Sequence, residues 1–92
     1  MDLSVTLAVA SSAINIPVPP EWVALGEVGL AGEVRAIPQL ERRLAEAARM
    51  GFTRALVPAG NLRNLRPMEG LECEGVDTLY HAFAVVLGKP NP

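Results

Sequence analysis

Apolar residues follow one another with little interruption at the start of the chain. Between residues 2 and 14, Leu3, Val5 and Leu7 lead into a run of alanine and valine that only serines and one threonine interrupt. A helix with this pattern has almost no polar face, so we expect it to be buried on most sides or to face another chain. Asp2 fits the start of this helix because its carboxylate can accept hydrogen bonds from the first free amides.

Prolines end this helix, and β-rich segments follow. Residues 17–20 contain three prolines, which lack an amide hydrogen and favour extended geometry in the residue before them. We interpret this segment as a rigid connector. Residues 22–28 and 33–37 predict two strands, and the glycine-bounded turn at residues 29–32 predicts that the two strands form a hairpin.

The clearest amphipathic helix is predicted from Pro38 to Met50, with Gly51 as its C-terminal stop. Its apolar residues recur at three- and four-residue steps, at Leu40, Leu44, Ala47, Ala48 and Met50. Its other face is charged and contains Glu41, Arg42, Arg43, Glu46 and Arg49. We expect Glu46 to form weak ion pairs with Arg42 and Arg49.

The rest of the chain predicts a strand, a loop and a second strand. Residues 53–57 form a short apolar run closed by Pro58, which predicts a buried strand in a sheet covered by the preceding helix. Residues 62–70 are irregular and basic. Residues 71–76 predict the second strand.

A final helix is predicted from Asp77, as its N-cap, through Leu87, with Gly88 and Pro90 ending it. Residues 1–92 contain no repeat and no internal boundary, so we expect a single α/β (α+β) domain with a small mixed sheet and three helices. Only 4% of the residues are aromatic although 50% are hydrophobic, so the core must be mainly aliphatic.

Charge and cysteine content narrow the possible functions. A net charge of −2 gives no general basic field, so any contact with DNA must be local. The single cysteine, Cys73, excludes an intrachain disulfide and a multi-cysteine zinc site, and it fits a reducing cytoplasm. Residues 3–18 are too polar and too short to cross a membrane, and we find no targeting segment.

Most residues that could take part in catalysis or metal binding lack the partner residues that such a site needs. Gly26, Gly29 and Gly32 are spaced like parts of a nucleotide loop, but no Lys-Ser or Lys-Thr follows them, so turn glycines are the better interpretation. His81 has neither a second histidine nor a nearby cysteine, and we interpret it as a partly exposed helical residue rather than a metal ligand. We therefore predict no metal site.

Two further groups could in principle perform chemistry. Glu27 and Glu33 flank the hairpin turn and could form an acid/base pair, although exposed turn carboxylates are ordinary. The serines of the first helix, Ser4, Ser11 and Ser12, need an activating base. The only lysine, Lys89, lies in a proline-rich tail and is more plausibly solvated.

Several short segments together resemble one family. They are Gly26-Glu-Val-Gly-Leu-Ala-Gly-Glu-Val-Arg35, Ile37-Pro38, Glu46-Ala-Ala, Gly51-Phe52, Arg54-Ala55 and Val57-Pro58, with Asp2-Leu3, Ser11-Ser12 and Pro17-Val18-Pro19 before them. This pattern resembles the C-terminal Lon-type domain of the RadA (Sms) family, and magnesium-chelatase-like competence proteins share a related pattern. The resemblance implies a Lon-protease-like, ribosomal protein S5 domain 2-like fold, present here as a partial domain.

The resemblance also implies that this chain is not an enzyme. Lon proteases use a serine just ahead of the first helix and a lysine early in the helix after the hairpin. Aligning these segments puts Glu41 at the lysine position and the serine position before Met1. A carboxylate cannot replace the amine base in this geometry. The alternative that stays open is half of a Lon-type serine peptidase domain that needs a partner chain.

By the same resemblance, the parent protein has a zinc module, a RecA-like ATPase core and this domain, which assists ring assembly and contacts branched or single-stranded DNA. The implied setting is a cytoplasmic homo-oligomer in DNA repair and recombination, without a membrane and without a cofactor in this chain. Arg63 and Arg66 are the preferred DNA contacts because we interpret them as lacking acidic neighbours on their loop. The other candidates are Arg35, Arg42, Arg43 and Arg54. A purely structural interaction module is the third interpretation.

Overall fold

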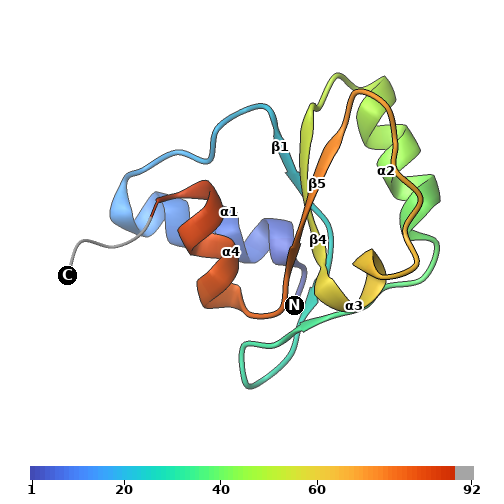
Figure 1. Ribbon diagram of the computed structural model, residues 1–92. Coiled ribbons are helices and arrows are strands. Elements are labelled where there is room, and N and C mark those ends of the chain that lie inside the picture. Colours follow the sequence, from blue (N-terminus) through green and yellow to red (C-terminus); the bar gives the residue numbers. More distant parts are fainter. Residues whose placement is uncertain (89–92) are drawn as a thin grey trace.

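The chain alternates short strands with helices around one small parallel sheet (Figure 1). The computed structural model describes residues 1–88. Lys89, predicted to lie in a proline-rich tail, and Pro90, predicted to help end the final helix, lie outside the described residues. In order, the elements are α1 (Leu3–Ile14), β1 (Trp22–Ala24), β2 (Glu27–Val28), β3 (Val34–Arg35), α2 (Leu40–Arg49), β4 (Arg54–Pro58), α3 (Ala59–Leu62), β5 (Glu72–Val76) and α4 (Leu79–Val86).

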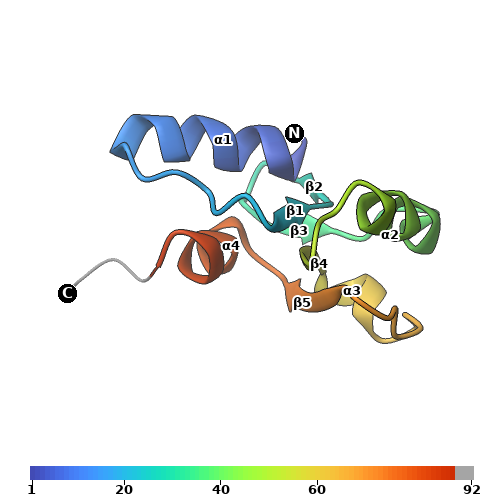
Figure 2. The ribbon, with the colours of Figure 1, turned by 90° about the horizontal axis from the view of Figure 1, so that it is seen from above.

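The main sheet has the strand order β1-β4-β5, and all its strands are parallel. β4 is the central strand, as expected for a buried apolar run, and Ala55, Leu56 and Val57 are completely inaccessible to solvent. Figures 1 and 2 show α1 and α4 on one side of this sheet and α2 on the other. The prediction of a buried strand covered by the preceding helix is confirmed.

Successive residues of a strand point to opposite faces, so β4 contributes to two separate hydrophobic cores. Leu56 packs in the core beneath α1 and α4, together with Leu3 and Leu7. Val57 packs in the core beneath α2, together with Leu44. Both cores are mainly aliphatic, as the composition predicted.

The expected strand at residues 22–28 is divided between two sheets. β1 pairs in parallel with β4, and the Leu25 amide still donates to the Leu56 carbonyl at 3.0 Å. After Gly26 the chain leaves this sheet, and β2 pairs antiparallel with β3. The predicted hairpin is therefore confirmed, although it is short. The predicted single mixed sheet is wrong, because β1 pairs with β4 in one sheet while β2 pairs with β3 in a separate sheet.

The hairpin of β2 and β3 is bonded to both the beginning and the end of the described chain. On one side, the Leu3 amide donates to the Gly26 carbonyl at 3.0 Å. On the other side, the Val34 amide donates to the Asp77 carbonyl at 2.9 Å, and the Leu79 amide donates to the Gly32 carbonyl at 2.8 Å. The hairpin thus holds α1 and α4 in position against the sheet.

The helices depart from the prediction in three respects. α2 begins two residues after Pro38, with Gln39 as its N-cap, so Pro38 lies outside its first turn. The N-cap of α4 is Thr78, whose hydroxyl accepts from the His81 amide at 3.0 Å. The predicted cap, Asp77, lies one residue earlier because its carbonyl is bonded to β3. The short helix α3 raises the number of helices in residues 1–88 to four, where three were expected.

α1 begins as predicted, since the Asp2 carboxylate accepts from the Val5 amide at 3.1 Å. Its burial contradicts the first of the two expectations, that the helix is buried on most sides. Only Leu3, Leu7 and Ser11 are buried, so the helix is not enclosed on most sides. Of the helices within residues 1–88, none combines the length and the hydrophobicity that a membrane crossing requires.

Candidate functional site

Every arginine of the chain is exposed, but some already have partners. The Arg35 guanidinium donates from Nη2 to Glu33 Oε2 at 2.9 Å, and Arg49 pairs with Glu46. The Arg54 guanidinium lies 4.4 Å from the centre of the Trp22 ring. These contacts are local and exposed, so they stabilise the protein only weakly.

Arg42, Arg43, Arg63 and Arg66 form no ion pair with any residue in the range 1–88. The expected pair between Arg42 and Glu46 is not formed, because Glu46 pairs with Arg49 instead. A guanidinium without an acidic neighbour can bind an external anion without first breaking an internal contact. The free arginines are therefore the stronger candidates for an external ligand.

The loop of residues 63–71, between α3 and β5, carries Arg63 and Arg66. Asn64 and Leu65 of this loop line a hollow of about 290 Å³ together with Gln39 and Glu41 at the start of α2. The hollow therefore joins the loop to the beginning of α2. Its polar groups are the amides of Gln39, Asn61 and Asn64 and the carboxylate of Glu41, and amide side chains of this kind are common contacts for phosphate and sugar.

The other arginines predicted as DNA contacts lie elsewhere. Arg43 is two residues after Glu41, so its side chain points about 200° away from that of Glu41 around α2. Arg43 therefore lies on the opposite side of α2 from the hollow. Arg54 begins β4, whereas Arg35 lies in the hairpin beyond the other end of the sheet. Arg35 and Arg43 are therefore separated from the loop of residues 63–71, whereas Arg54 borders a hollow of about 450 Å³ together with Met68, Gly70 and Leu71 of this loop.

Arg66 borders a different hollow, of about 250 Å³, which is lined mainly by Leu62, Leu65, Pro67, Met68, Leu71 and Cys73. Its aliphatic stem can cover this apolar surface while the guanidinium stays in water. Burial raises the pKa of the Cys73 thiol above its ordinary value. The thiolate is therefore disfavoured, and Cys73 acts here as a small hydrophobic residue.

Asn61 fixes the position of α3 beside the segment that leads into α2. Its Oδ1 accepts from the Ile37 amide at 2.9 Å, and its Nδ2 donates to the Ile37 carbonyl at 3.0 Å. This role could not be predicted from the sequence, because Asn61 and Ile37 lie far apart in the chain and a lone asparagine can have many roles. The clamp holds the loop against the start of α2.

We expect Asn61→Ala to lower the free energy of unfolding by about 1–2 kcal/mol, because the partly buried amide and carbonyl of Ile37 lose their partner. Urea unfolding followed by circular dichroism measures this loss. Asn64→Ala is the matched control, since the Asn64 side chain is exposed. Equal losses in both variants would show that the clamp does not stabilise the fold.

Glu41 lies in the first turn of α2, where a carboxylate is favoured by the positive end of the helix dipole. It therefore has a structural role independent of catalysis. The serines of α1 lie on the other side of the sheet from α2 (Figure 2). Ser11 donates its hydroxyl to the Ile16 carbonyl, and Ser4 lines an apolar groove. Neither Ser4 nor Ser11 therefore lies near Glu41, the residue at the predicted position of the catalytic base on α2.

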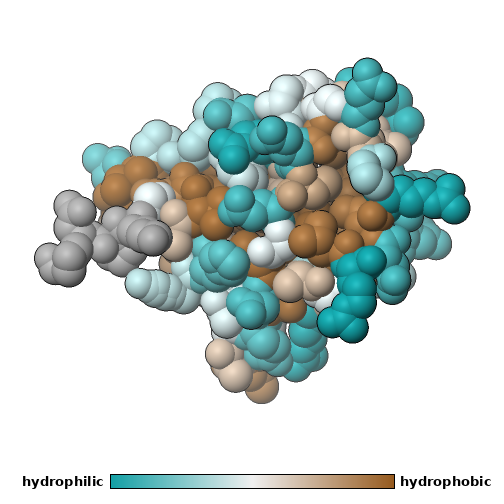
Figure 3. All heavy atoms as spheres, viewed as in Figure 1, coloured by the Kyte–Doolittle hydropathy of each residue, from teal (hydrophilic) through white to brown (hydrophobic). Residues whose placement is uncertain are grey.

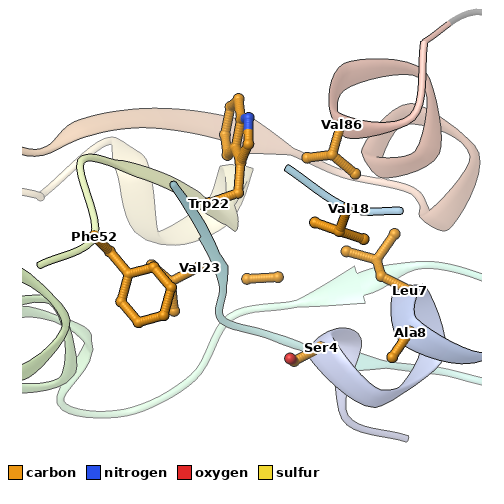
Figure 4. A pocket seen from close by; sticks show the side chains of 9 residues that line it. Ser4, Leu7, Ala8, Val18, Trp22, Val23, Phe52 and Val86 are labelled. Carbon is orange, nitrogen blue, oxygen red and sulfur yellow. The ribbon is translucent and has the colours of Figure 1, made fainter. Parts of the chain in front are cut away.

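The groove beside Ser4 has a volume of about 160 Å³ and lies between α1, β1 and the end of α4 (Figure 4). Its walls are mainly aliphatic and aromatic, from Leu7, Ala8, Val18, Trp22, Val23, Phe52 and Val86. It contains no carboxylate, imidazole or amine. The groove suits an apolar group rather than a reaction.

The two hairpin carboxylates have separate partners, as expected for turn residues. Glu27 Oε1 accepts from the Met1 amino group at 2.7 Å. Glu33 accepts from Arg35 and, at 3.0 Å, from the Ala31 amide. A hydrogen bond from its own backbone amide, followed by the one from Arg35, lowers the pKa of the Glu33 carboxyl.

The lowered pKa of Glu33 predicts a dependence of stability on pH. The contribution of Glu33 is present above the ordinary pKa of 4.5 and is lost as the pH falls through the lower pKa of the folded state. Glu33→Gln should therefore flatten the acid side of a plot of the urea midpoint against pH. Glu69→Gln, on the exposed loop, is the control. Identical acid profiles for wild type and Glu33→Gln would contradict the assignment.

His81 is exposed on α4, as predicted, and its Nδ1 lies 3.6 Å from Asp77 Oδ1. Within residues 1–88 there is no group of three or more His, Cys, Asp or Glu side chains that could hold a metal ion. An isolated, exposed pair of this kind, between α4 and the residue before its N-cap, is an ordinary surface contact.

Comparison with known proteins identifies similar sequences. A family model described as subunit ChlI of Mg-chelatase matches residues 1–61. The DNA repair protein RadA of Escherichia coli (strain K12) is 46% identical over 84 residues, which are 91% of this chain and 18% of that protein. RadA of Bacillus subtilis (strain 168) is 40% identical over 88 residues, or 96% of this chain and 19% of that protein. The chain therefore spans about a fifth of the length of these relatives.

Proposed function

Because this chain belongs to the family described by subunit ChlI of Mg-chelatase and is similar over nearly its whole length to the DNA repair protein RadA, we propose that it is a non-catalytic scaffold of a RadA-type repair and recombination ATPase. In this role it contacts branched or single-stranded DNA and supports assembly of the parent protein. We place it in the cytoplasm.

The observation that carries the DNA contact is the pair of free arginines on the loop of residues 63–71. Arg63 and Arg66 have no acidic partner within residues 1–88, and the amides of Gln39 and Asn64 line the adjacent hollow. Guanidinium groups bind phosphate oxygens in pairs of hydrogen bonds, and amides add contacts to phosphate and sugar. The net charge of −2 means that such binding depends on this local surface.

The non-catalytic scaffold role is supported by Glu41, which lies where we expect the catalytic lysine of a Lon-type peptidase. We propose a partial Lon-protease-like, ribosomal protein S5 domain 2-like fold, in which Glu41 takes the position of the catalytic lysine. A carboxylate at this point stabilises α2, and it cannot act as an amine base. Half of a peptidase domain is therefore the weaker candidate.

Binding of fluorescein-labelled single-stranded and branched DNA tests the proposal, with anisotropy measured across a range of NaCl concentrations. We expect the affinity to fall steadily with salt, because each arginine that contacts a phosphate displaces a condensed counterion. Absence of binding at low salt would favour the purely structural interaction module.

Assembly is tested separately, by the mass of the chain in solution at increasing concentration. A scaffold that supports a ring is expected to form larger species as the concentration rises. A constant monomer mass at every concentration would remove assembly from the proposed function and leave the DNA contact unaffected.

A further inference from the structure

Three side chains lie in one row across the main sheet, where its parallel strands begin. The register pairs Trp22 of β1 with Arg54 of β4, and Arg54 with Glu72 of β5. Residues paired in this way project from the same face of a sheet, so the three side chains are neighbours. Figure 3 shows hydrophilic atoms at the top, over the beginning of the sheet, with hydrophobic atoms beside them. This end of the sheet therefore combines polar and apolar surface.

Arg54 is held in the middle of this row. Its guanidinium carbon lies 4.4 Å from the centre of the Trp22 ring, and its Nε lies 3.9 Å from Glu72 Oε2. A separation of 3.9 Å is too long for a hydrogen bond, so this ion pair uses neither the acceptors of Glu72 nor the donors of Arg54. Within residues 1–88, arginine side chains donate hydrogen bonds at Arg35 and Arg49. Arg54 therefore offers a positioned guanidinium whose N–H groups are available to a ligand.

The hollow of about 450 Å³ lies beside this row and is closed by the loop of residues 63–71. Its lining residues are Thr53, Arg54, Met68, Gly70, Leu71 and Glu72. The part that belongs to the loop is a tight turn, in which the Leu71 amide donates to the Met68 carbonyl at 3.2 Å and Gly70 has a φ of 81°. Apolar walls, N–H donors and a carboxylate acceptor together suit a small planar molecule with polar edges.

The charges around the hollow favour a nucleic acid base over a phosphate. The carboxylate of Glu72 offsets the positive charge of Arg54, so an anion gains little there. Arg63 and Arg66 on the same loop have no acidic partner within residues 1–88, so phosphate groups are expected to bind to them instead. A strand whose phosphates lie on this loop can place a base in the hollow at its end.

We propose that this hollow holds one base of single-stranded DNA, and that Arg54 and Glu72 select a base with an amino group in preference to thymine. The inference rests on the DNA contact of the proposed function and adds base selection at one position. The amino group of cytosine donates to a carboxylate, while its ring acceptors accept from a guanidinium. Thymine has a carbonyl oxygen in place of that amino group, and the Glu72 carboxylate repels it.

Anisotropy titrations with labelled oligo(dC) and oligo(dT) of equal length, at one low salt concentration, test this selection. We expect the wild-type chain to bind oligo(dC) about fivefold more tightly, the lower end of the effect of one base contact. Glu72→Gln should bring the ratio of the two affinities to about one, because an amide can donate to thymine as well as accept from cytosine. Glu72 is exposed, so the variant should keep the wild-type circular dichroism spectrum.

The outcomes separate this inference from the DNA contact itself. Arg63→Ala combined with Arg66→Ala should weaken the binding of both oligonucleotides by the same factor and leave their ratio unchanged, because phosphate contacts carry no sequence information. Equal binding of the two oligonucleotides by the wild-type chain overturns the base site, although the DNA contact stands. Binding of neither oligonucleotide at low salt overturns both.

Arg54→Lys provides a second test, which a change of total charge cannot imitate. The variant keeps the positive charge but loses the planar fork of donors, so the preference for oligo(dC) should disappear while the salt dependence of binding stays as in the wild type. Arg49→Lys is the matched control, because Arg49 is exposed and pairs with Glu46 on α2. It should keep the wild-type preference. A preference that survives in Arg54→Lys, or that is lost equally in Arg49→Lys, would overturn the role of Arg54.

Discussion

Replacing Arg63 and Arg66 together with alanine is expected to lower the affinity of the chain for single-stranded DNA at low salt by about a hundredfold, roughly tenfold for each lost contact to phosphate. The slope of log affinity against log salt should fall in magnitude by about two, since each phosphate contact contributes about one to that slope. The reason is that both guanidinium groups lack an internal acidic partner within residues 1–88. Anisotropy titrations at several salt concentrations measure both quantities.

The combination of Arg35→Ala with Arg49→Ala is the matched control for this result. It removes the same charge, but both arginines are already paired with glutamates. We expect the control to weaken binding only slightly and to leave the slope nearly unchanged. If the two double variants lose affinity equally, DNA responds to the total charge of the chain, and the loop of residues 63–71 is not a binding surface.

Leu56→Ala is expected to lower the free energy of unfolding by about 2–5 kcal/mol, the usual cost of a cavity in a close-packed core. Leu56 is completely buried in the central strand, where it packs with residues of α1 and α4. The free energy of unfolding of a domain of this size is small, so we expect much of the variant to be unfolded at ambient temperature. Urea denaturation, or the thermal midpoint where a folded population remains, measures the effect.

Leu30→Ala provides the comparison, because Leu30 at the hairpin tip is fully exposed. Its removal should change the free energy of unfolding by less than about 0.5 kcal/mol. If both leucine variants were equally stable, β4 would not be the centre of the core. A large loss only at Leu56 would confirm that the parallel sheet carries most of the stability.

Features that depend on neighbouring residues could be predicted from the sequence. The regular spacing of Leu40, Leu44 and Ala47 predicted α2 and its buried side, and the glycines around the hairpin turn predicted its position. Asp2 was correctly expected to cap α1. In each case the deciding interactions lie within one helix or one turn.

Features that depend on distant residues could not be predicted in the same way. The division of residues 22–28 between two sheets follows from the pairing of β1 with β4, which no local pattern specifies. The cap of α4 moved from Asp77 to Thr78 because β3 bonds to the Asp77 backbone. Such choices are made by tertiary contacts that override local preference.

In the candidate site, too, features set by neighbouring residues could be predicted, whereas features set by distant residues could not. The sequence indicated Arg63 and Arg66 from their basic loop, and in the structure both are exposed and form no ion pair within residues 1–88. It did not indicate the Asn61 clamp, because this contact depends on how α3 packs beside the segment that leads into α2. Of the two expectations for α1, enclosure on most sides is wrong, because only Leu3, Leu7 and Ser11 are buried. The other expectation, that α1 faces another chain, stays a prediction.

The bonds from the hairpin to both α1 and α4 also constrain the order in which the molecule can form. Leu3, Val34 and Asp77 are distant in sequence, so their contacts require long loops to close before any stabilisation is gained. The parallel pairs of β1 with β4 and of β4 with β5 add further non-local contacts. A chain with these connections is expected to fold more slowly than a helical bundle of equal length.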